Sequence, residues 1–113
     1  MNWPRGRPWP LLSSFAVPSL EEALLRAPEQ PRGLLIDRPT ARALATLDRL
    51  DCASLHCDQK AVSTELVRAL DASGRPLLCY TVNDPARALL LRDVGVASII
   101  TDRPAEIGAV VGF

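Results

Sequence analysis

The sequence Leu77-Leu78-Cys79-Tyr80-Thr81-Val82, followed directly by Asn83-Asp84-Pro85, contains the clearest structural signal in this chain. A short run of apolar, aromatic and β-branched residues, bounded by turn-forming residues, is typical of a buried β-strand. Asp84 is a favoured N-cap residue, and a proline fits the first position of a helix because no backbone N–H is needed there. The stretch therefore predicts a strand at residues 77–82 and a helix that begins at Pro85.

Four other short apolar runs repeat this pattern along the chain. They are Leu11–Phe15, Gly33–Asp37, Ala53–His56 and Ser98–Asp102. With the run at residue 77, the starting residues are 22, 20, 24 and 21 positions apart. Each interval has room for one helix, and strands that alternate with helices form a parallel sheet. We therefore expect an α/β fold with about five βα units.

The segments between the runs contain signals for the start and end of helices. Ser19-x-x-Glu22 has the spacing of a capping box, and Thr64 can cap the helix that follows it. Gly74 and Gly95 lie where a left-handed residue ends a helix, and Pro104 can open the last one. These signals fill the intervals between the predicted strands with helices.

Two architectures accommodate five parallel strands of this kind. A complete, doubly wound sheet of the flavodoxin type fits the length of 113 residues. An incomplete (β/α)8 barrel also fits, since a complete barrel takes about 250 residues. Periodicity does not separate the two folds. Both bind ligands at the carboxyl ends of their strands, so the residues there carry the functional information.

The composition is that of one folded domain and excludes several classes of protein. The chain has 13 Lys and Arg and 13 Asp and Glu, so its net charge is zero, which disfavours a nucleic-acid surface or a polybasic membrane patch. No apolar run approaches the roughly 20 residues that span a bilayer. Residues 1–9, with prolines and two arginines, predict an irregular lead-in and no signal peptide. We expect a soluble domain at residues 10–113.

The cysteines and the histidine limit the chemistry of this chain. Cys52, Cys57 and Cys79 are odd in number and contain no CxxC pair, which fits neither a disulfide framework nor a zinc site. We expect free thiols in a reducing cytoplasm. The single histidine, His56, excludes any mechanism that needs two histidines from this chain.

The predicted carboxyl ends of the strands bring together polar side chains and two aromatic rings. They are Ser13, Ser14, Phe15, Asp37, His56, Tyr80, Thr81, Asn83, Thr101 and Asp102. Such a ring could hold a small hydroxylated ligand. Phe15 and Tyr80 are interpreted either as packing residues or as walls of a ligand site. His56 is interpreted either as a general acid or base or as a residue that only forms hydrogen bonds.

The remaining candidates have structural explanations. Asp37, Asp84 and Asp102 each precede a predicted helix and are interpreted as caps. Ser13 and Ser14 lack the GxSxG elbow of a serine nucleophile. The chain also contains no glycine-rich phosphate loop of the GxGxxG or GxxxxGK type. These residues do not form an active site by themselves.

Five segments at these strand ends resemble a known family. They are Pro10–Phe15, Pro31–Asp37, Ser54–His56, Cys79–Asn83 and Ile100–Pro104. In this order they are similar to the second half of the bacterial glycerophosphodiester phosphodiesterases, most closely to the cytoplasmic type of the glycerol-3-phosphate uptake system. The resemblance implies the C-terminal part, about five βα units, of a (β/α)8 TIM barrel of the phospholipase C-like phosphodiesterase type.

The resemblance also implies a reaction and a set of site residues. Members of the family hydrolyse glycerophosphodiesters to glycerol 3-phosphate and an alcohol with a divalent metal, Mg²⁺ or Ca²⁺, two histidines and a set of carboxylates. The family's His-Arg-Gly and Glu-x-Asp motifs are absent from this sequence, so we expect no catalytic residue and no bound metal in this chain alone. The residues that carry over are Phe15 and Tyr80 as pocket walls, with His56 and Asn83 as nearby polar groups.

The missing half leads to a prediction about the whole chain. Five strands cannot close an eight-stranded barrel, so the first and last strands would be open edges. The side chains expected to point inward are those of Leu12, Leu35, Leu55, Leu78 and Ile99. We expect an inactive chain that self-associates or pairs with an N-terminal half. The alternatives are a non-catalytic binding or assembly module and a self-sufficient flavodoxin-like domain.

Overall fold

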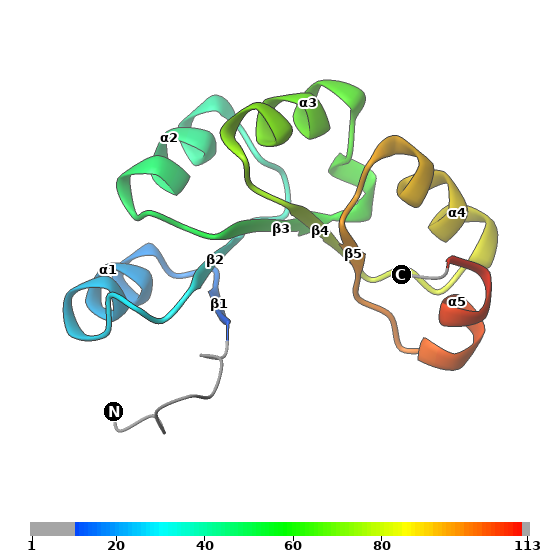
Figure 1. Cartoon of the computed structure of the whole chain (residues 1–113), viewed down its shortest axis with the longest axis horizontal. Coiled ribbons are helices and arrows are strands. Elements are labelled where there is room, and N and C mark those ends of the chain that lie inside the picture. The colour runs from blue at the N-terminus through cyan, green and yellow to red at the C-terminus, as the bar shows by residue number, and fades with distance from the viewer. Residues whose placement is uncertain (1–10, 112–113) are drawn as a thin grey trace.

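The computed structural model describes residues 11–111, in which five parallel strands alternate with five α-helices (Figure 1). The expected lead-in at residues 1–9 lies outside this range. A single 3₁₀ turn, η1, follows the third strand. The elements are β1 (Leu12–Ser14), α1 (Val17–Arg26), β2 (Arg32–Leu35), α2 (Ala41–Arg49), β3 (Ser54–Asp58), η1 (Gln59–Ala61), α3 (Thr64–Ser73), β4 (Leu77–Tyr80), α4 (Pro85–Val94), β5 (Ser98–Ile99) and α5 (Pro104–Val111).

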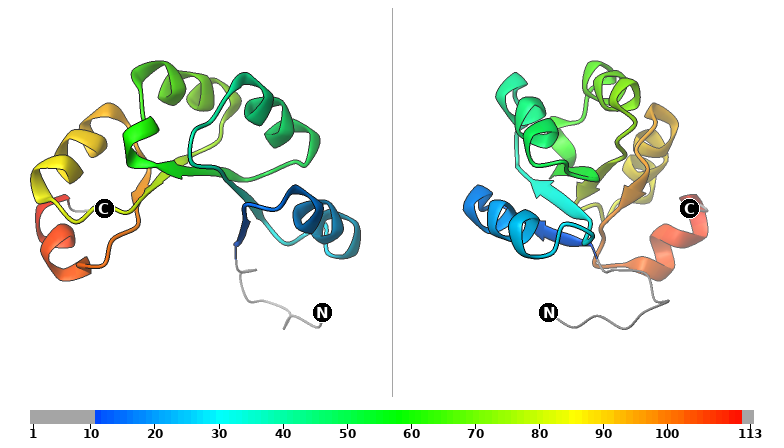
Figure 2. Two further views of the ribbon diagram at one scale, coloured as in Figure 1. Left: turned by 180° about the vertical axis from the view of Figure 1, so that it is seen from behind. Right: turned by 60° about the vertical axis from the view of Figure 1, so that its left-hand side comes forward.

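The sheet is an arc of a (β/α) barrel. Its strands lie in the order β1-β2-β3-β4-β5, and each is parallel to its neighbours. The helices lie on the convex side of the sheet, and no helix of residues 11–111 lies on the concave side (Figures 1 and 2). A flavodoxin-type sheet has the order 2-1-3-4-5 and helices on both faces. The flavodoxin-like alternative is therefore wrong, and the incomplete barrel is confirmed.

The core lies between the sheet and its helices. Leu55 of β3 and Leu77 of β4 are register partners under the helical layer and are almost completely buried. The helices contribute one buried face each, of which Leu20, Leu47, Leu70 and Leu91 are the largest side chains. Burying such a side chain stabilises the fold by about 1.5–3 kcal/mol, so this layer holds the open sheet together.

The expected inward-pointing residues were assigned correctly in only two strands. Leu35 and Leu78 are both register partners of His56 and face the concave side with it. Leu55 faces the helices, where it is fully buried. Leu12 and Ile99 pair with Arg32 and Cys79, which also belong to the helical side. Because side chains alternate along a strand, a register error of one residue reverses the face.

Two of the predicted helix starts were displaced. Helix α1 begins at Val17 after Ala16, without a side-chain cap, so Ser19 lies inside the helix and the expected capping box does not form. Helix α3 is capped by Ser63, whose hydroxyl accepts a hydrogen bond from the Leu66 amide, and not by Thr64. At α3 the adjacent Ser63 and Thr64 were both candidates for the cap, whereas α1 starts one residue before Pro18 with Ala16 in the cap position.

The helix ends predicted at Asp84, Gly74, Gly95 and Pro104 are confirmed. Asp84 caps α4 by accepting a hydrogen bond from the Ala86 amide at 3.2 Å. Gly74 and Gly95 end α3 and α4 with φ angles of 72° and 115°, in the left-handed region that glycine tolerates. Pro104 opens α5. The terminal residues of these helices are thus encoded locally.

Arg32, for which the sequence predicted no role, is buried at the start of β2. Arg32 is 2% exposed, and its guanidinium donates hydrogen bonds to the carbonyl oxygens of Leu50, Gln30, Asp51 and Pro28 at 2.8–3.3 Å. No carboxylate of the described chain pairs with it. The guanidinium thus ties the loop before β2 to the loop after α2 at the amino end of the sheet.

The three cysteines are free and buried, as expected. Cys57 and Cys79 are register partners on β3 and β4 and are fully buried, while Cys52 is 3% exposed. Burial raises the pKa of Cys57 to about 12 and that of Cys79 to about 11, and it also raises the pKa of Cys52. The thiols therefore remain protonated at neutral pH and behave as small apolar residues.

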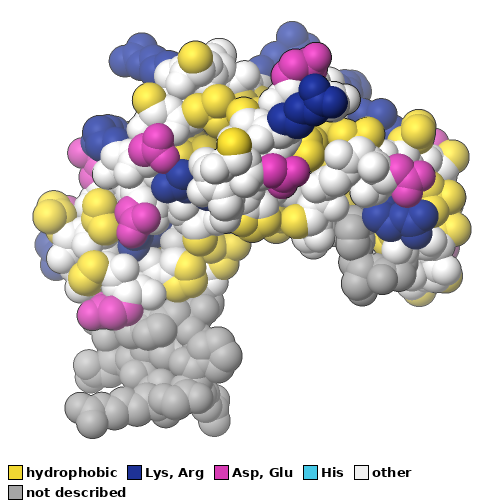
Figure 3. All heavy atoms as spheres, turned by 45° about the horizontal axis from the view of Figure 1, so that its top comes forward, with side chains coloured by type: hydrophobic (Ala, Val, Ile, Leu, Met, Phe, Trp, Pro, Cys, Tyr) yellow, Lys and Arg dark blue, Asp and Glu magenta, His cyan; other side chains and the backbone are white. Residues whose placement is uncertain are grey.

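The outer surface is polar and of mixed charge. Figure 3 shows basic and acidic side chains interspersed over the helical side, with apolar side chains between them. This pattern agrees with the net charge of zero and contains no broad field of one sign. Within residues 11–111, none of the helices has the length and apolar character required to cross a membrane.

Candidate functional site

The bare side of the sheet forms a groove, which we call the concave groove. It has a volume of about 530 Å³ and is lined by Leu11, Ser13, Phe15, Leu35, His56, Leu78, Tyr80, Thr81 and Ile100. Three of these apolar residues are unusually exposed: Phe15 at 61%, Ile100 at 45% and Leu11 at 42%. The groove ends at the carboxyl ends of the strands, where ligands bind in parallel α/β folds.

His56 lies in the middle of β3 and not at its end, because the strand continues to Asp58. It is 3% exposed, and both ring nitrogens are engaged: Nε2 with Ser54 Oγ at 2.8 Å and Nδ1 with Ser13 Oγ at 2.9 Å. The buried Ser54 hydroxyl has no other partner among the described residues, so we assign it as the donor to Nε2. Nδ1–H then donates to Ser13.

This environment keeps the His56 imidazole neutral. Burial lowers its pKa from the usual 6.5, and no carboxylate among residues 11–111 is hydrogen-bonded to it. A neutral ring whose two nitrogens are both committed has no free lone pair for a substrate proton. The geometry therefore agrees with the interpretation of His56 as a residue that only forms hydrogen bonds.

Tyr80 and Asp37 connect two strands across the carboxyl end of the sheet. The Tyr80 hydroxyl, at the end of β4, donates to Asp37 Oδ1 at 2.5 Å, beyond the end of β2, and thereby bridges the intervening β3. Partial burial and this hydrogen bond raise the pKa of Tyr80. Asp37 was expected to cap α2, but Thr40 does so by accepting a hydrogen bond from the Ala43 amide. Asp37 instead orients the Tyr80 ring.

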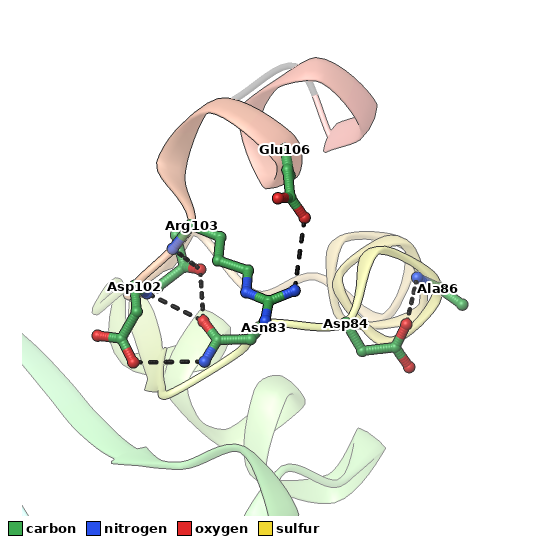
Figure 4. Close-up of polar contacts among 7 residues, drawn as sticks. Asn83, Asp84, Ala86, Asp102, Arg103 and Glu106 are labelled. Atoms are coloured by element: carbon green, nitrogen blue, oxygen red, sulfur yellow. Dashed lines mark hydrogen bonds and ion pairs between the residues drawn. The ribbon is translucent and has the colours of Figure 1, made fainter.

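Asn83 belongs to a separate cluster that joins the loops after β4 and β5 (Figure 4). Its Oδ1 accepts hydrogen bonds from Thr101 Oγ1 and the Asp102 amide, both at 2.9 Å, and its Nδ2 donates to Asp102 Oδ2 at 3.3 Å. Thr101 in turn accepts from the Arg103 amide at 3.0 Å. Asp102 was expected to cap α5, which begins at Pro104, but its carboxylate instead accepts the hydrogen bond from Asn83. The cluster fixes the two loops relative to each other.

The carboxylates at this end of the sheet do not form a metal site. Asp37 accepts from Tyr80, Asp58 from the Lys60 amide and Asp102 from Asn83. Within residues 11–111 no group of three or more His, Cys, Asp or Glu side chains is close enough to hold a metal ion. A divalent cation requires several oxygen donors at once. The donor set of the described chain does not fit one, and we derive no step through a metal.

The structure brings together three of the four predicted site residues. Phe15, His56 and Tyr80 line the concave groove, while the amide of Asn83 is used in the loop cluster. Sequence reasoning missed Asp58, which ends β3 beside Tyr80. The sequence did contain a signal for Asp58: the apolar Cys57 directly after His56 extends the strand, so that the strand ends at Asp58 and not at His56.

A curved parallel sheet with its helices outside and polar side chains at the carboxyl ends is the arrangement of (β/α)-barrel enzymes. A model of the glycerophosphoryl diester phosphodiesterase family matches residues 8–106. The chain belongs to this family. A search of curated proteins finds no match.

Solved structures agree with this assignment. The chain is similar to an Oleispira antarctica phosphodiesterase in complex with the product sn-glycerol-3-phosphate, with 32% identity and a TM-score of 0.89 over 98% of this chain and 44% of that one. Glycerophosphodiester phosphodiesterases from Parabacteroides distasonis and Thermotoga maritima share the fold. They have 22% and 24% identity and TM-scores of 0.76 and 0.66, over 88% and 81% of this chain and 42% of each of theirs. The chain spans less than half the length of these three proteins.

Proposed function

We propose that residues 10–113 are the C-terminal half of a glycerophosphodiester phosphodiesterase domain. The complete enzyme would hydrolyse glycerophosphodiesters to glycerol 3-phosphate and an alcohol. The observation that carries this proposal is the 32% identity, over 98% of this chain, to a phosphodiesterase that holds sn-glycerol-3-phosphate. The family match and the five-stranded arc support it.

In this proposal the chain contributes the wall of the substrate pocket. Phe15 presents an exposed ring at the end of β1, and Tyr80 presents a ring held by Asp37, so both can pack against the glycerol and the leaving group. His56 positions Ser13 in the pocket wall through their hydrogen bond, and Asn83 holds together the loops that follow β4 and β5. The acid–base groups and the Mg²⁺ or Ca²⁺ site would belong to the remainder of the barrel.

The isolated chain is then inactive and requires a partner. Its exposed apolar residues in the concave groove support pairing with an N-terminal half or with a second copy of the chain. The same observation supports the second candidate function, a non-catalytic assembly module. Its three free thiols support a location in the reducing cytoplasm.

A hydrolysis assay tests this proposal. The purified chain, incubated with glycerophosphocholine and either Mg²⁺ or Ca²⁺, is expected to release no glycerol 3-phosphate. Adding the N-terminal half of the Oleispira relative is expected to produce metal-dependent hydrolysis. In that mixture Phe15→Ala and Tyr80→Ala should raise KM more than they lower kcat, because they remove ground-state contacts. Leu25→Ala, at a residue 80% exposed on α1, is the control.

Two results would contradict the proposal. Turnover by the chain alone would show that it contains a catalytic apparatus. A mixture that associates and yet fails to hydrolyse any glycerophosphodiester would favour the assembly module.

A further inference from the structure

A second groove lies on the outer side of the molecule between α1 and α2, and we call it the helix groove. Its volume is about 800 Å³, within the usual range of small-molecule sites. Its floor is apolar, with Val17, Leu34, Ile36 and Ala43 among its lining residues. At the ends of β1 and β2 it shares Phe15 and Leu35 with the concave groove. No described side chain fills it. A ligand with an apolar body would therefore find both space and contact surface there.

The rim of this groove is cationic. Arg38, Arg42 and Arg49 all line it, and the first two are exposed and form no ion pair with any residue in the range 11–111. Arg49 lies 3.8 Å from Glu21 of α1 and is thus partly neutralised. Asp37, the other acidic residue near the rim, keeps its negative charge while it accepts the Tyr80 hydrogen bond, so the three arginines exceed the two carboxylates by one charge. The rim therefore retains positive charge above an apolar floor.

The charges are distributed unevenly along α2. Arg38 and Arg42 lie around the first turn of this helix, at the carboxyl end of β2, whereas Arg49 is its last residue. A nine-residue helix is about 13 Å long, so the unpaired charges lie at one end of an elongated apolar surface. This polarity matches a molecule with one anionic end and one apolar chain.

We propose that the helix groove binds a single-chain amphipathic anion, with its phosphate or carboxylate between Arg38 and Arg42 and its alkyl chain along α2 towards Arg49. Arginine side chains bind such oxyanions through charge-assisted, often bidentate hydrogen bonds. The volume suits one small amphiphile. The inference goes beyond the phosphodiesterase activity and rests on Arg38, Arg42 and the exposed side of α2, which the proposed substrate pocket does not use.

Binding of dodecyl phosphate to the full chain tests this inference. Equilibrium dialysis below the concentration at which the ligand forms micelles is expected to give saturable binding at one site. Inorganic phosphate, which lacks the chain, should not bind. Dodecyl maltoside, which has the same chain and no charge, should bind about tenfold more weakly or worse. These two ligands separate recognition of the head group from non-specific uptake of the alkyl chain.

Matched variants locate the site. Arg38→Gln combined with Arg42→Gln is expected to weaken dodecyl phosphate binding by about tenfold or more, since each arginine supplies a charge-assisted contact. Ala45→Trp, at an exposed lining residue, should block the groove. Arg68→Gln is the control, because Arg68 is exposed on α3 outside the groove and forms no ion pair with described residues. Circular dichroism verifies the fold of each variant.

Three binding results would overturn the inference, and so would one result on self-association. They are unchanged binding by the double arginine variant, equal binding of dodecyl maltoside, and no binding of dodecyl phosphate by the folded chain. Loss of self-association in the arginine variant without any ligand binding would assign the groove to a second copy of the chain and would also overturn it.

Discussion

Arg32 places a buried charge at the amino end of the sheet. Its guanidinium has no counter-ion in the described chain and is satisfied by four carbonyl groups. A buried charge is tolerated only when it is fully hydrogen-bonded, and the loss of the donor leaves the carbonyls without partners. The side chain thus holds the loops at the amino end of the sheet in place.

We expect Arg32→Met to lower the free energy of unfolding by about 2–4 kcal/mol, because it leaves the buried carbonyl groups of Leu50 and Gln30 without their donor. Urea denaturation measures this change. Arg68→Met, at an exposed arginine of α3, should change the stability by less than about 0.5 kcal/mol. Equal effects of the two substitutions would show that the carbonyl contacts do not stabilise the fold.

His56 makes the stability depend on pH in a defined window. Burial lowers its pKa in the folded state below 6.5, so the unfolded chain takes up the proton first as the pH falls. The stabilisation is complete above about pH 6.5 and is lost progressively as the pH falls through the lowered value. Because His56 is the only histidine, His56→Gln should flatten the pH dependence of the free energy of unfolding in the range just below about pH 6.5. Denaturation midpoints that still fall in this variant over that window would contradict the assignment.

At the scale of elements, β2 and β3 are held in close contact by a glycine. A Cβ atom at Gly33 would lie 2.9 Å from two atoms of the His56 ring and 3.2 Å from Ser54 Oγ. The ring cannot retreat without breaking its two hydrogen bonds to serine. Gly33 therefore permits the buried histidine that connects β1 with β3.

We expect Gly33→Ala to destabilise the chain by about 1–3 kcal/mol through overpacking. Gly108→Ala is the matched control, because Gly108 lies inside α5 with open space around its added Cβ. There alanine should stabilise by about 0.5–1 kcal/mol through its helix propensity. Thermal unfolding of the two variants should therefore shift in opposite directions, and a shift in the same direction would contradict the argument.

The features of helices and strands that depend on neighbouring residues in the sequence were predicted correctly, and those that depend on distant residues were not. Asp84, Gly74 and Gly95 were located correctly because each acts on its own backbone. The inward faces of β1, β3 and β5 were assigned wrongly. The alternation of side chains shows which residues share a face, but the pairing with neighbouring strands decides which face points towards the helices. Leu55 therefore lies under the helices, although its apolar character alone would suit either face.

The same distinction applies to the candidate site. The strand-end positions of Phe15 and Tyr80 followed from the runs of apolar residues. The Tyr80–Asp37 bond joins residues 43 positions apart, and the pairing of His56 with Ser13 spans the same separation. No local pattern encodes such contacts, because they depend on the curvature of the sheet.

At the scale of the whole molecule, the open arc determines how the chain behaves in solution. Within the described part of the chain, strands β1 and β5 each have one neighbouring strand, and Phe15 and Ile100 expose their side chains on the concave side. Unpaired parallel edges beside apolar side chains promote association. We expect concentration-dependent self-association of the isolated chain.

Phe15→Ser combined with Ile100→Ser should reduce this association, as measured by analytical ultracentrifugation at micromolar concentration. Leu25→Ser provides the control, since Leu25 is 80% exposed on the outer helix α1. A strictly monomeric chain with a sharp two-state melt above about 60 °C would contradict the expectation, because the arc would then be stable without a partner.

The buried cysteines give the molecule an internal reporter of its own opening. Alkylating reagents attack thiolates, and the folded chain offers them neither thiolate nor access at Cys52, Cys57 or Cys79. The rate at which the thiols become labelled therefore reports how often the helical layer separates from β3 and β4. A complementary half-barrel that closed the arc would be detected as a slowing of this labelling, without any assay of catalysis.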